Sequence, residues 1–314
     1  MKIGFIGLGN VGGKLSGSLI RNGEDVQVFD LDPDLIDLKV AAGATQGEGP
    51  AQMMRACDAV ITCLPSPAAS AAVVHEMLPE VRAGKIWIEM STTDAADIKR
   101  LAGLVAERDG RAVDCPVSGG CHRADTGNIS IYAGCDRPTF ERVLPVLTHM
   151  GRRILHVGDI GTASTLKVMT NYLATANLLT LCEALTVMKA SGVDLGLTYE
   201  AIAMSSGNSF VHETESQLIL SGSRDVNFTM DLIQKDIGLF QKLADDAGVP
   251  LEISPLMIQM MTDGQARYGL RAQSDRMIER LEEATGLRIL ADGFPQELVD
   301  DEPEERGYEV ARRH

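Results

Sequence analysis

The sequence has little positive charge, few aromatic residues and no long uninterrupted apolar run. Its 29 lysines and arginines stand against 44 aspartates and glutamates, which makes the formal net charge −15. A balance this acidic argues against a nucleic-acid backbone or an anionic membrane as the main partner. The most apolar stretch, residues 59–74, is interrupted by Pro65 and Pro67, so we expect no membrane insertion.

The chain also lacks a Cys-x-x-Cys pair and the features of a leader peptide. None of its six cysteines has the spacing to histidine that is typical of a metal site, so reduced thiols and no bound metal are expected. Lys2 is followed by a strand-like Ile3-Gly4-Phe5-Ile6, without the apolar region and small-residue cleavage site of a signal peptide. These features predict a cytoplasmic protein.

The chain has 314 residues, of which 45% are hydrophobic and 23% charged, close to the averages of globular proteins. This length suits about two domains. In the first half, short apolar runs that are typical of buried parallel strands alternate with amphipathic, helix-like stretches. The expected strands are residues 2–6, 25–29, 58–64, 85–89, 111–114, 129–133 and 154–157. The expected helices are residues 11–21, 33–41, 68–78, 94–108 and 138–149.

This alternation predicts the α/β class, with a Rossmann-type doubly wound sheet domain over residues 1–161. Residues 164–191 contain neither proline nor glycine and predict a long interdomain helix. It joins the sheet domain to an all-α C-terminal domain over residues 162–290, whose further helices are expected at 198–205, 213–220, 230–247, 251–268 and 274–285. The acidic residues 291–314 predict a tail that is either solvated and disordered or packed on a neighbouring subunit.

A glycine-rich motif follows the first expected strand and opens the first helix. It reads Gly7-Leu8-Gly9-Asn10-Val11-Gly12, and this position in a βαβ unit is typical of a dinucleotide-binding turn. Gly7 would allow the tight turn, Gly9 the approach of a pyrophosphate, and Gly12 the close packing of helix on strand. Backbone N–H groups of Asn10 and Val11 at the helix start would help to hold the phosphates. The alternative is a glycine-rich turn without a ligand.

Asp30 ends the second expected strand, where an acidic side chain can accept hydrogen bonds from the ribose hydroxyls of the adenosine. A 2′-phosphate placed there would face Asp30, and no lysine or arginine stands beside it in the sequence. We therefore expect NAD as the cofactor and regard NADP as disfavoured. Asp32 precedes Pro33 and is interpreted as a helix cap rather than a ligand.

Four further groups of residues occur in a fixed order along the chain. They are Asp114-Cys115-Pro116-Val117-Ser118-Gly119-Gly120, Gly161, the pair Lys167 and Asn171, and Lys235-Asp236. Together with the glycine motif at residues 7–12, they resemble the motifs of the β-hydroxyacid dehydrogenase family, typified by 3-hydroxyisobutyrate dehydrogenase. The resemblance covers roughly residues 1–290 and leaves only the tail outside.

The resemblance implies a catalytic pair on the long helix. Oxidising an alcohol by hydride transfer needs a group that takes the hydroxyl proton, and by resemblance Lys167 is this general acid/base. Asn171 lies four residues further along and shares its helix face, so by resemblance it orients the substrate and the lysine. On residue type alone, a helical lysine is usually a solvated surface charge.

The resemblance also assigns binding residues. Ser118, Gly119 and Gly120 would hold the substrate carboxylate through converging backbone N–H groups, and Lys235 would close over the cofactor and substrate. Other residues at strand ends are expected to contact the dinucleotide: these are Leu64, Pro65 and Thr92.

Residues 122 and 123 depart from the family, whose members usually carry small residues there. Arg123 can form a bidentate pair with a second anionic group of the substrate. The alternative is that it pairs with Asp125 or solvent. Phe210 and His212 match the distal end of the family's substrate pocket; the alternative is a structural role, because a lone histidine is more often structural.

The function that we predict is an NAD-dependent oxidoreductase that interconverts a short-chain 3-hydroxy acid and its semialdehyde. One alternative is a semialdehyde reductase for a dianionic or sulfonated substrate, motivated by Arg123. An alternative of another class is a non-catalytic dinucleotide-binding module. The expected partners are the small-molecule substrate and further copies of the chain, as a homodimer or homotetramer, with no nucleic acid and no membrane.

Overall fold

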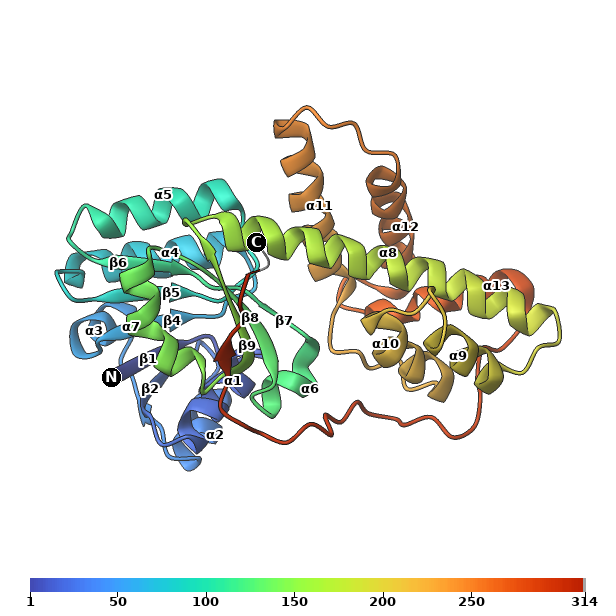
Figure 1. The fold of residues 1–314 in the computed structure, drawn as a ribbon, viewed down its shortest axis with the longest axis horizontal. Coiled ribbons are helices and arrows are strands. Elements are labelled where there is room, and N and C mark those ends of the chain that lie inside the picture. The colour runs from blue at the N-terminus through green and yellow to red at the C-terminus, as the bar shows by residue number, and fades with distance from the viewer. Residues whose placement is uncertain (313–314) are drawn as a thin grey trace. The chain divides into compact units, whose positions relative to one another are not determined.

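The computed structural model describes residues 1–312 and divides into two compact units. The first unit comprises Met1–Lys167 and the chain from Asp300 onward, and the second comprises Val168–Val299. The first contains a sheet with its helices, whereas the second is helical (Figure 1). The predicted fold class, a Rossmann-type α/β domain followed by an all-α domain, is therefore confirmed.

The strands of the first unit form one sheet in the order β10-β9-β8-β6-β5-β4-β1-β2-β3, with β7 paired to β8. The strands are β1 (Lys2–Ile6), β2 (Asp25–Phe29), β3 (Thr45–Gln46), β4 (Ala59–Thr62), β5 (Ile86–Glu89), β6 (Arg111–Asp114), β7 (Val117–Ser118), β8 (Ile129–Gly134), β9 (Gly151–Gly158) and β10 (Tyr308–Glu309). From β3 to β6 all neighbouring strands are parallel. The chain order reverses between β1 and β4, and dinucleotides bind at such a switch point in open α/β sheets.

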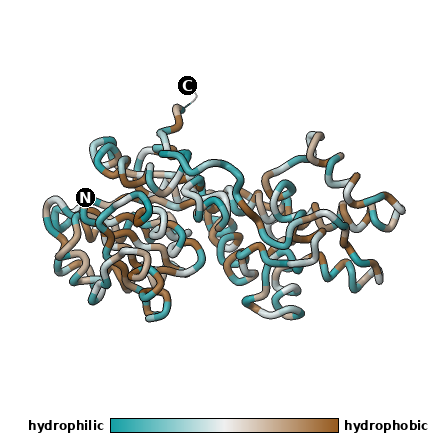
Figure 2. The backbone as a smooth tube through the Cα atoms, turned by 90° about the horizontal axis from the view of Figure 1, so that it is seen from below, coloured by the Kyte–Doolittle hydropathy of each residue, from teal (hydrophilic) through white to brown (hydrophobic). Residues whose placement is uncertain are grey.

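Helices cover both faces of this sheet. They are α1 (Gly12–Arg21), α2 (Pro33–Ala41), α3 (Pro50–Ala56), α4 (Pro67–Met77), α5 (Ala95–Ala106), α6 (Gly120–Asp125) and α7 (Arg137–Leu147), with a 3₁₀ turn η1 at Leu78–Glu80. Successive strand residues point to opposite faces, so Ile61 belongs to the apolar cluster that contains residues of α1, α2 and α7, whereas its neighbour Val60 belongs to the cluster that contains residues of α3, α4 and α5. Figure 2 shows apolar stretches inside this unit and hydrophilic ones along its outer loops.

The second unit is built on the long helix α8 (Thr162–Ala190), which begins in the first unit. The other helices are α9 (Leu195–Ala203), α10 (Phe210–Ser221), α11 (Met230–Asp246), α12 (Ile253–Tyr268), the 3₁₀ helix η2 (Ser274–Ile278) and α13 (Glu279–Thr285). Opposite sides of α8 enter two apolar clusters, one containing Leu178 and Leu185 and the other containing Leu179. The predicted helices all occur, with ends shifted by a few residues.

Helix α8 is also the one helix among residues 1–312 that is long and apolar enough to cross a membrane by length and composition. Of its most apolar window, 39% is buried within the protein. Some of its apolar side chains, such as Leu178, Leu179 and Leu185, pack into the two clusters of the second unit.

The last part of the C-terminal tail packs on the chain's own first unit. The chain from Asp300 belongs to the first unit, and β10 pairs in parallel with β9 (Figure 1). The tail carboxylates meet arginine, hydroxyl and amide groups of that unit, for example in the ion pair of Glu309 with Arg137. The tail is therefore not a disordered end. It is also not a separate segment from residue 291, because its residues up to Val299 belong to the second unit and those from Asp300 to the first. The structural division also falls inside α8 at Lys167, later than the expected boundary at residue 161.

Candidate active site

The glycine-rich turn connects β1 to α1 and has the geometry that its sequence predicts. Gly7 has a φ of +95°, and a Cβ there would lie 2.3 Å from the carbonyl oxygen of Cys63. A Cβ at Gly12 would lie 2.0 Å from the oxygen of Gly7. Gly9, by contrast, is exposed, and a Cβ there would meet nothing within 4 Å. Two glycines are thus required by packing, and the third leaves open space beside the helix start, where a pyrophosphate would fit.

Asp30 follows β2 and is tied to this turn. Its Oδ2 accepts a hydrogen bond of 2.6 Å from the backbone N of Leu8, and its Oδ1 one of 3.0 Å from the N of Asp32. The carboxylate therefore lies beside the glycine-rich turn. Asp32 caps α2 by accepting from the N of Asp34 at 3.0 Å, which confirms its interpretation as a cap.

The other residues expected to contact the dinucleotide follow neighbouring parallel strands. Leu64 and Pro65 come after β4, and Thr92 comes after β5. The backbone N of Leu64 donates a 2.7 Å hydrogen bond to Ser91 Oγ, which links the two strand ends. Because the carboxyl ends of parallel strands meet at one edge, these residues lie on the same edge as the glycine-rich turn.

The Ser118-Gly119-Gly120 turn leaves the short strand β7 and enters α6, neither of which the sequence predicted. Gly119 and Gly120 have φ values of +130° and +86°, a region that only glycine adopts freely. The stem of Arg123 packs on this turn, since a Cβ at Gly119 would lie 3.5 Å from Arg123 Cδ. Its guanidinium pairs with Glu302 at 3.2 Å. A role for Arg123 in substrate binding stays a prediction.

Lys167 lies in the second turn of α8, and its residue is only 8% exposed. The start of this helix is held by Asp114 at the end of β6. The Asp114 carboxylate accepts hydrogen bonds from the backbone N of Gly161 and Ser164, both at 2.9 Å, and from Ser164 Oγ at 2.6 Å. Burial raises the pKa of Asp114, while these hydrogen bonds act to lower it. The sequence motif contained Asp114 but did not indicate that it anchors the helix of the candidate catalytic lysine.

In the second unit, the structure brings together Asn171 of α8 and the Lys235-Asp236 pair of α11. Asn171 Nδ2 donates to Asp236 Oδ2 at 2.5 Å, and Lys235 Nζ lies 2.7 Å from Asp236 Oδ1. Asp236 is 2% exposed, so it is a buried bridge between the two helices.

His212 is a structural residue of the second unit. It is 1% exposed, its Nε2 lies 3.0 Å from the oxygen of Tyr199, and its ring packs on the Tyr199 ring at 4.6 Å. Burial lowers its pKa, so the neutral form is favoured. Phe210 begins α10 and is 40% exposed. The structure supports the alternative that this histidine serves packing.

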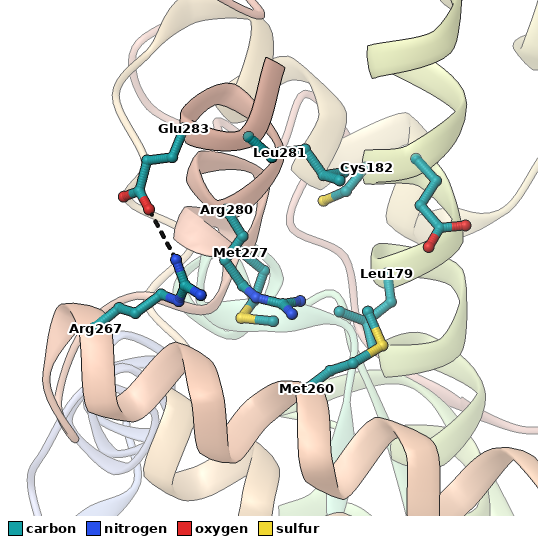
Figure 3. Close-up of a pocket in the computed structure, with 10 residues that line it drawn as sticks. Leu179, Cys182, Met260, Arg267, Met277, Arg280, Leu281 and Glu283 are labelled. Atoms are coloured by element: carbon teal, nitrogen blue, oxygen red, sulfur yellow. Dashed lines mark hydrogen bonds and ion pairs between the residues drawn. The ribbon is translucent and has the colours of Figure 1, made fainter. Parts of the chain in front are cut away.

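A cavity of about 420 Å³ lies elsewhere in the second unit, away from the sequence motifs (Figure 3). Its apolar side chains include Leu179, Met260 and Met277, and its polar side chains include Arg267 paired with Glu283 at 3.1 Å. Among residues 1–312, no group of three or more His, Cys, Asp or Glu side chains is arranged to hold a metal ion. The candidate functional residues are therefore the motif residues described above for each unit.

Family models match both parts of the chain. Residues 2–158 match the NAD-binding domain of 6-phosphogluconate dehydrogenase, and residues 161–281 match the NAD-binding domain of NADP-dependent 3-hydroxyisobutyrate dehydrogenase. With the glycine-rich turn at the switch point of the sheet, these matches define a pyridine-nucleotide-binding oxidoreductase.

Relatives narrow the class. The chain is 32% identical to 2-(hydroxymethyl)glutarate dehydrogenase of Eubacterium barkeri over 92% of this chain and 97% of that protein. It is 30% identical to mitochondrial 3-hydroxyisobutyrate dehydrogenase of Mus musculus over 82% of this chain and 80% of that one. A solved 3-hydroxyisobutyrate dehydrogenase of Mycobacterium tuberculosis with L-serine shares the fold, with a TM-score of 0.80 at 23% identity over 89% and 98% of the two chains. The chain belongs to the β-hydroxyacid dehydrogenase family.

Proposed function

We propose that this protein interconverts a short-chain 3-hydroxy acid and its semialdehyde by hydride transfer, with NAD as cofactor and Lys167 as general acid/base. The observation that carries the proposal is the placement of Lys167: a nearly buried lysine on a helix whose start is anchored to β6 through Asp114. A solvated surface lysine would need neither the burial nor the anchor. Family membership supports the same role.

Each motif residue has a task in this reaction. Lys167 would take the hydroxyl proton during oxidation and return it during reduction. Asn171 would orient the substrate oxygen, and its own amide is oriented by Asp236. Backbone N–H groups of the turn at Ser118–Gly120 would bind the substrate carboxylate. When bound, the nicotinamide accepts or supplies the hydride.

The preference for NAD rests on Asp30. Its carboxylate lies at the phosphate-binding turn, where it would accept hydrogen bonds from both ribose hydroxyls and repel a 2′-phosphate. NADP remains the less favoured cofactor.

A second candidate is a dianionic substrate. Two observations favour it: the stem of Arg123 packs on the turn at Gly119, and one relative is named for a substituted glutarate, which is a dicarboxylate. Glu302 opposes it, because its carboxylate already neutralises the guanidinium. An Arg123→Ala variant would raise the KM for dianionic substrates alone if the arginine binds the second anionic group. Equal effects on mono- and dianionic substrates would reject this candidate.

The experiment that tests the proposal follows nicotinamide absorbance with NAD and NADP across short-chain 3-hydroxy acids and dicarboxylic analogues. Lys167→Ala is expected to lower kcat by about 10²- to 10⁴-fold with the dinucleotide still bound. Lys189→Ala removes the same charge from the last turn of α8 and serves as the control. Near-normal turnover in the folded Lys167→Ala protein would contradict the assigned role. Dinucleotide binding without turnover of any hydroxy acid would favour a non-catalytic module.

A further inference from the structure

The C-terminal tail returns to the dinucleotide-binding unit and lies in contact with its sheet. The backbone N of Gly307 donates to the oxygen of Thr148 at 2.9 Å, and a Cβ at Gly307 would lie 1.9 Å from the oxygen of Gly151. Glu309 of β10 then pairs with Arg137 of α7. Neither family model extends past residue 281, so this contact lies outside the matched domains.

Asp300 and Glu302 of the tail contact residues at the C-terminal end of α6. Asp300 Oδ2 accepts hydrogen bonds from the hydroxyl of Thr126 and, at 2.8 Å, from Asn128 Nδ2. The same amide nitrogen donates to the backbone oxygen of Glu302 at 2.9 Å. Burial acts to raise the pKa of Asp300, but hydrogen bonds from Thr126, Asn128 and the backbone of Glu302, together with the charge of Arg123, lower that pKa overall. The carboxylate is therefore ionised at neutral pH, and ionised acceptors form the stronger hydrogen bonds.

Glu302 extends this contact to the candidate carboxylate-binding turn. Its Oε1 lies 3.2 Å from Arg123 Nη2, and the stem of Arg123 lies against Gly119. The turn contains two successive glycines with positive φ, and Gly119 provides no side-chain cap for α6. Glycines lose the most conformational freedom on ordering, so such a turn gains most from contacts that fix it from outside.

We propose that Asp300 and Glu302 are positioning residues for substrate binding, which hold α6 so that the backbone N–H groups of residues 118–120 converge on the substrate carboxylate. This inference rests on the proposed function. It makes the tail a part of the substrate site that acts through Arg123, Thr126 and Asn128 and touches no reacting atom. Removing these two carboxylates is therefore expected to weaken binding of the hydroxy acid and to leave the dinucleotide turn at residues 7–12 unaffected.

The test compares two sets of tail variants in the full chain. Asp300→Ala/Glu302→Ala removes the carboxylates that contact α6, whereas Glu309→Ala removes one that pairs with Arg137 at the other end of the tail. The double variant is expected to raise the KM of the hydroxy acid about five- to twentyfold, with kcat and the Kd of NAD within about twofold of the unmodified protein. The variant Asp300→Ala/Glu302→Gln keeps an acceptor oxygen for Arg123. It is therefore expected to raise the KM of the hydroxy acid less than Asp300→Ala/Glu302→Ala does. A KM that rises no more than in Glu309→Ala would overturn the inference.

A second measurement needs no substrate. Backbone hydrogen exchange is expected to speed up about tenfold at residues 119–128 in the double variant and to stay unchanged at residues 7–12. If the unmodified protein turns over no hydroxy acid, the proposed function fails while this measurement still tests the positioning role. Unchanged exchange at residues 119–128 would overturn that role whatever the activity.

Discussion

At the scale of single residues, the candidate site depends on side chains that hold other groups in place. Asp114 fixes the start of α8, Asp236 joins Asn171 to Lys235, and Asp30 joins β2 to the glycine-rich turn. Each is a carboxylate whose hydrogen bonds orient a neighbouring element. Substituting them should therefore change binding geometry as well as charge.

For Asp30, we predict a change in cofactor preference. Asp30→Ser removes the negative charge that would face a 2′-phosphate and is expected to lower the ratio of kcat/KM for NAD to that for NADP about tenfold or more. Asp32→Ser is the matched control, because Asp32 caps α2. Steady-state kinetics with both dinucleotides measures the ratio. An unchanged ratio in Asp30→Ser would show that another residue selects the cofactor.

For Asp275, we predict a pH-dependent stability of the second unit. Asp275 is 0% exposed, and among the described residues neither of its carboxylate oxygens has a hydrogen-bond partner. Burial raises its pKa to about 7. The folded form therefore keeps a proton that the unfolded form loses, so stability is fully present below about pH 4 and falls as the pH rises through 7.

Asp275→Asn is expected to remove this loss and to stabilise the protein at pH 8 by on the order of 2 kcal/mol, with little effect at pH 4. Thermal denaturation at a series of pH values measures the difference. Asp292→Asn changes an exposed aspartate of the same unit and is the control. A variant curve parallel to that of the unmodified protein from pH 4 to 8 would rule out the effect.

At the scale of elements, the glycines of the turn between β1 and α1 have different roles, some in the stability of the fold and one in binding. Gly12 packs against the oxygen of Gly7, whereas Gly9 faces open space. The same substitution at these two positions should therefore have different consequences.

Gly9→Ala is expected to leave the melting temperature within about 2 °C, because its Cβ meets no atom, and to weaken dinucleotide binding at least about tenfold by filling the pyrophosphate space. Gly12→Ala is expected to destabilise the fold by about 3 kcal/mol, because its Cβ would overlap a backbone oxygen. Thermal denaturation and fluorescence titration with NAD measure the two effects. Wild-type NAD affinity in Gly9→Ala would remove the phosphate-binding role of this turn.

At the scale of the whole molecule, the second unit exposes large apolar side chains. Leu173 and Val187 of α8 are 51% and 57% exposed, and Leu256 of α12 is 55% exposed. Exposed apolar surface of this kind is typical of contacts between subunits. We predict a homodimer or homotetramer, which sedimentation velocity measures directly. Leu173→Asp/Val187→Asp is expected to shift the distribution toward the monomer, with Leu31→Asp, 93% exposed on the first unit, as control. A monomer at all concentrations of the unmodified protein would contradict the prediction.

The sequence alone determined the fold class, the family and the dinucleotide turn. Strands such as residues 2–6 and 25–29 were predicted at their observed bounds, because local apolar patterning and glycine spacing carry that information. Short elements such as β7 and α6 were missed, since the two residues of β7 span a single strand period and the six residues of α6 span fewer than two helical turns.

Only the tertiary structure decided the course of the tail and the partners of Arg123. Asp300 and Glu302 lie more than 170 residues from the α6 groups that they contact, and no local pattern marks such a pairing. An acidic, proline-containing segment is predicted to be a solvated end, because its composition shows its charge but not the groups that neutralise that charge. The groups that neutralise these carboxylates lie in elements much earlier in the sequence. The contact therefore exists only once the sheet has folded.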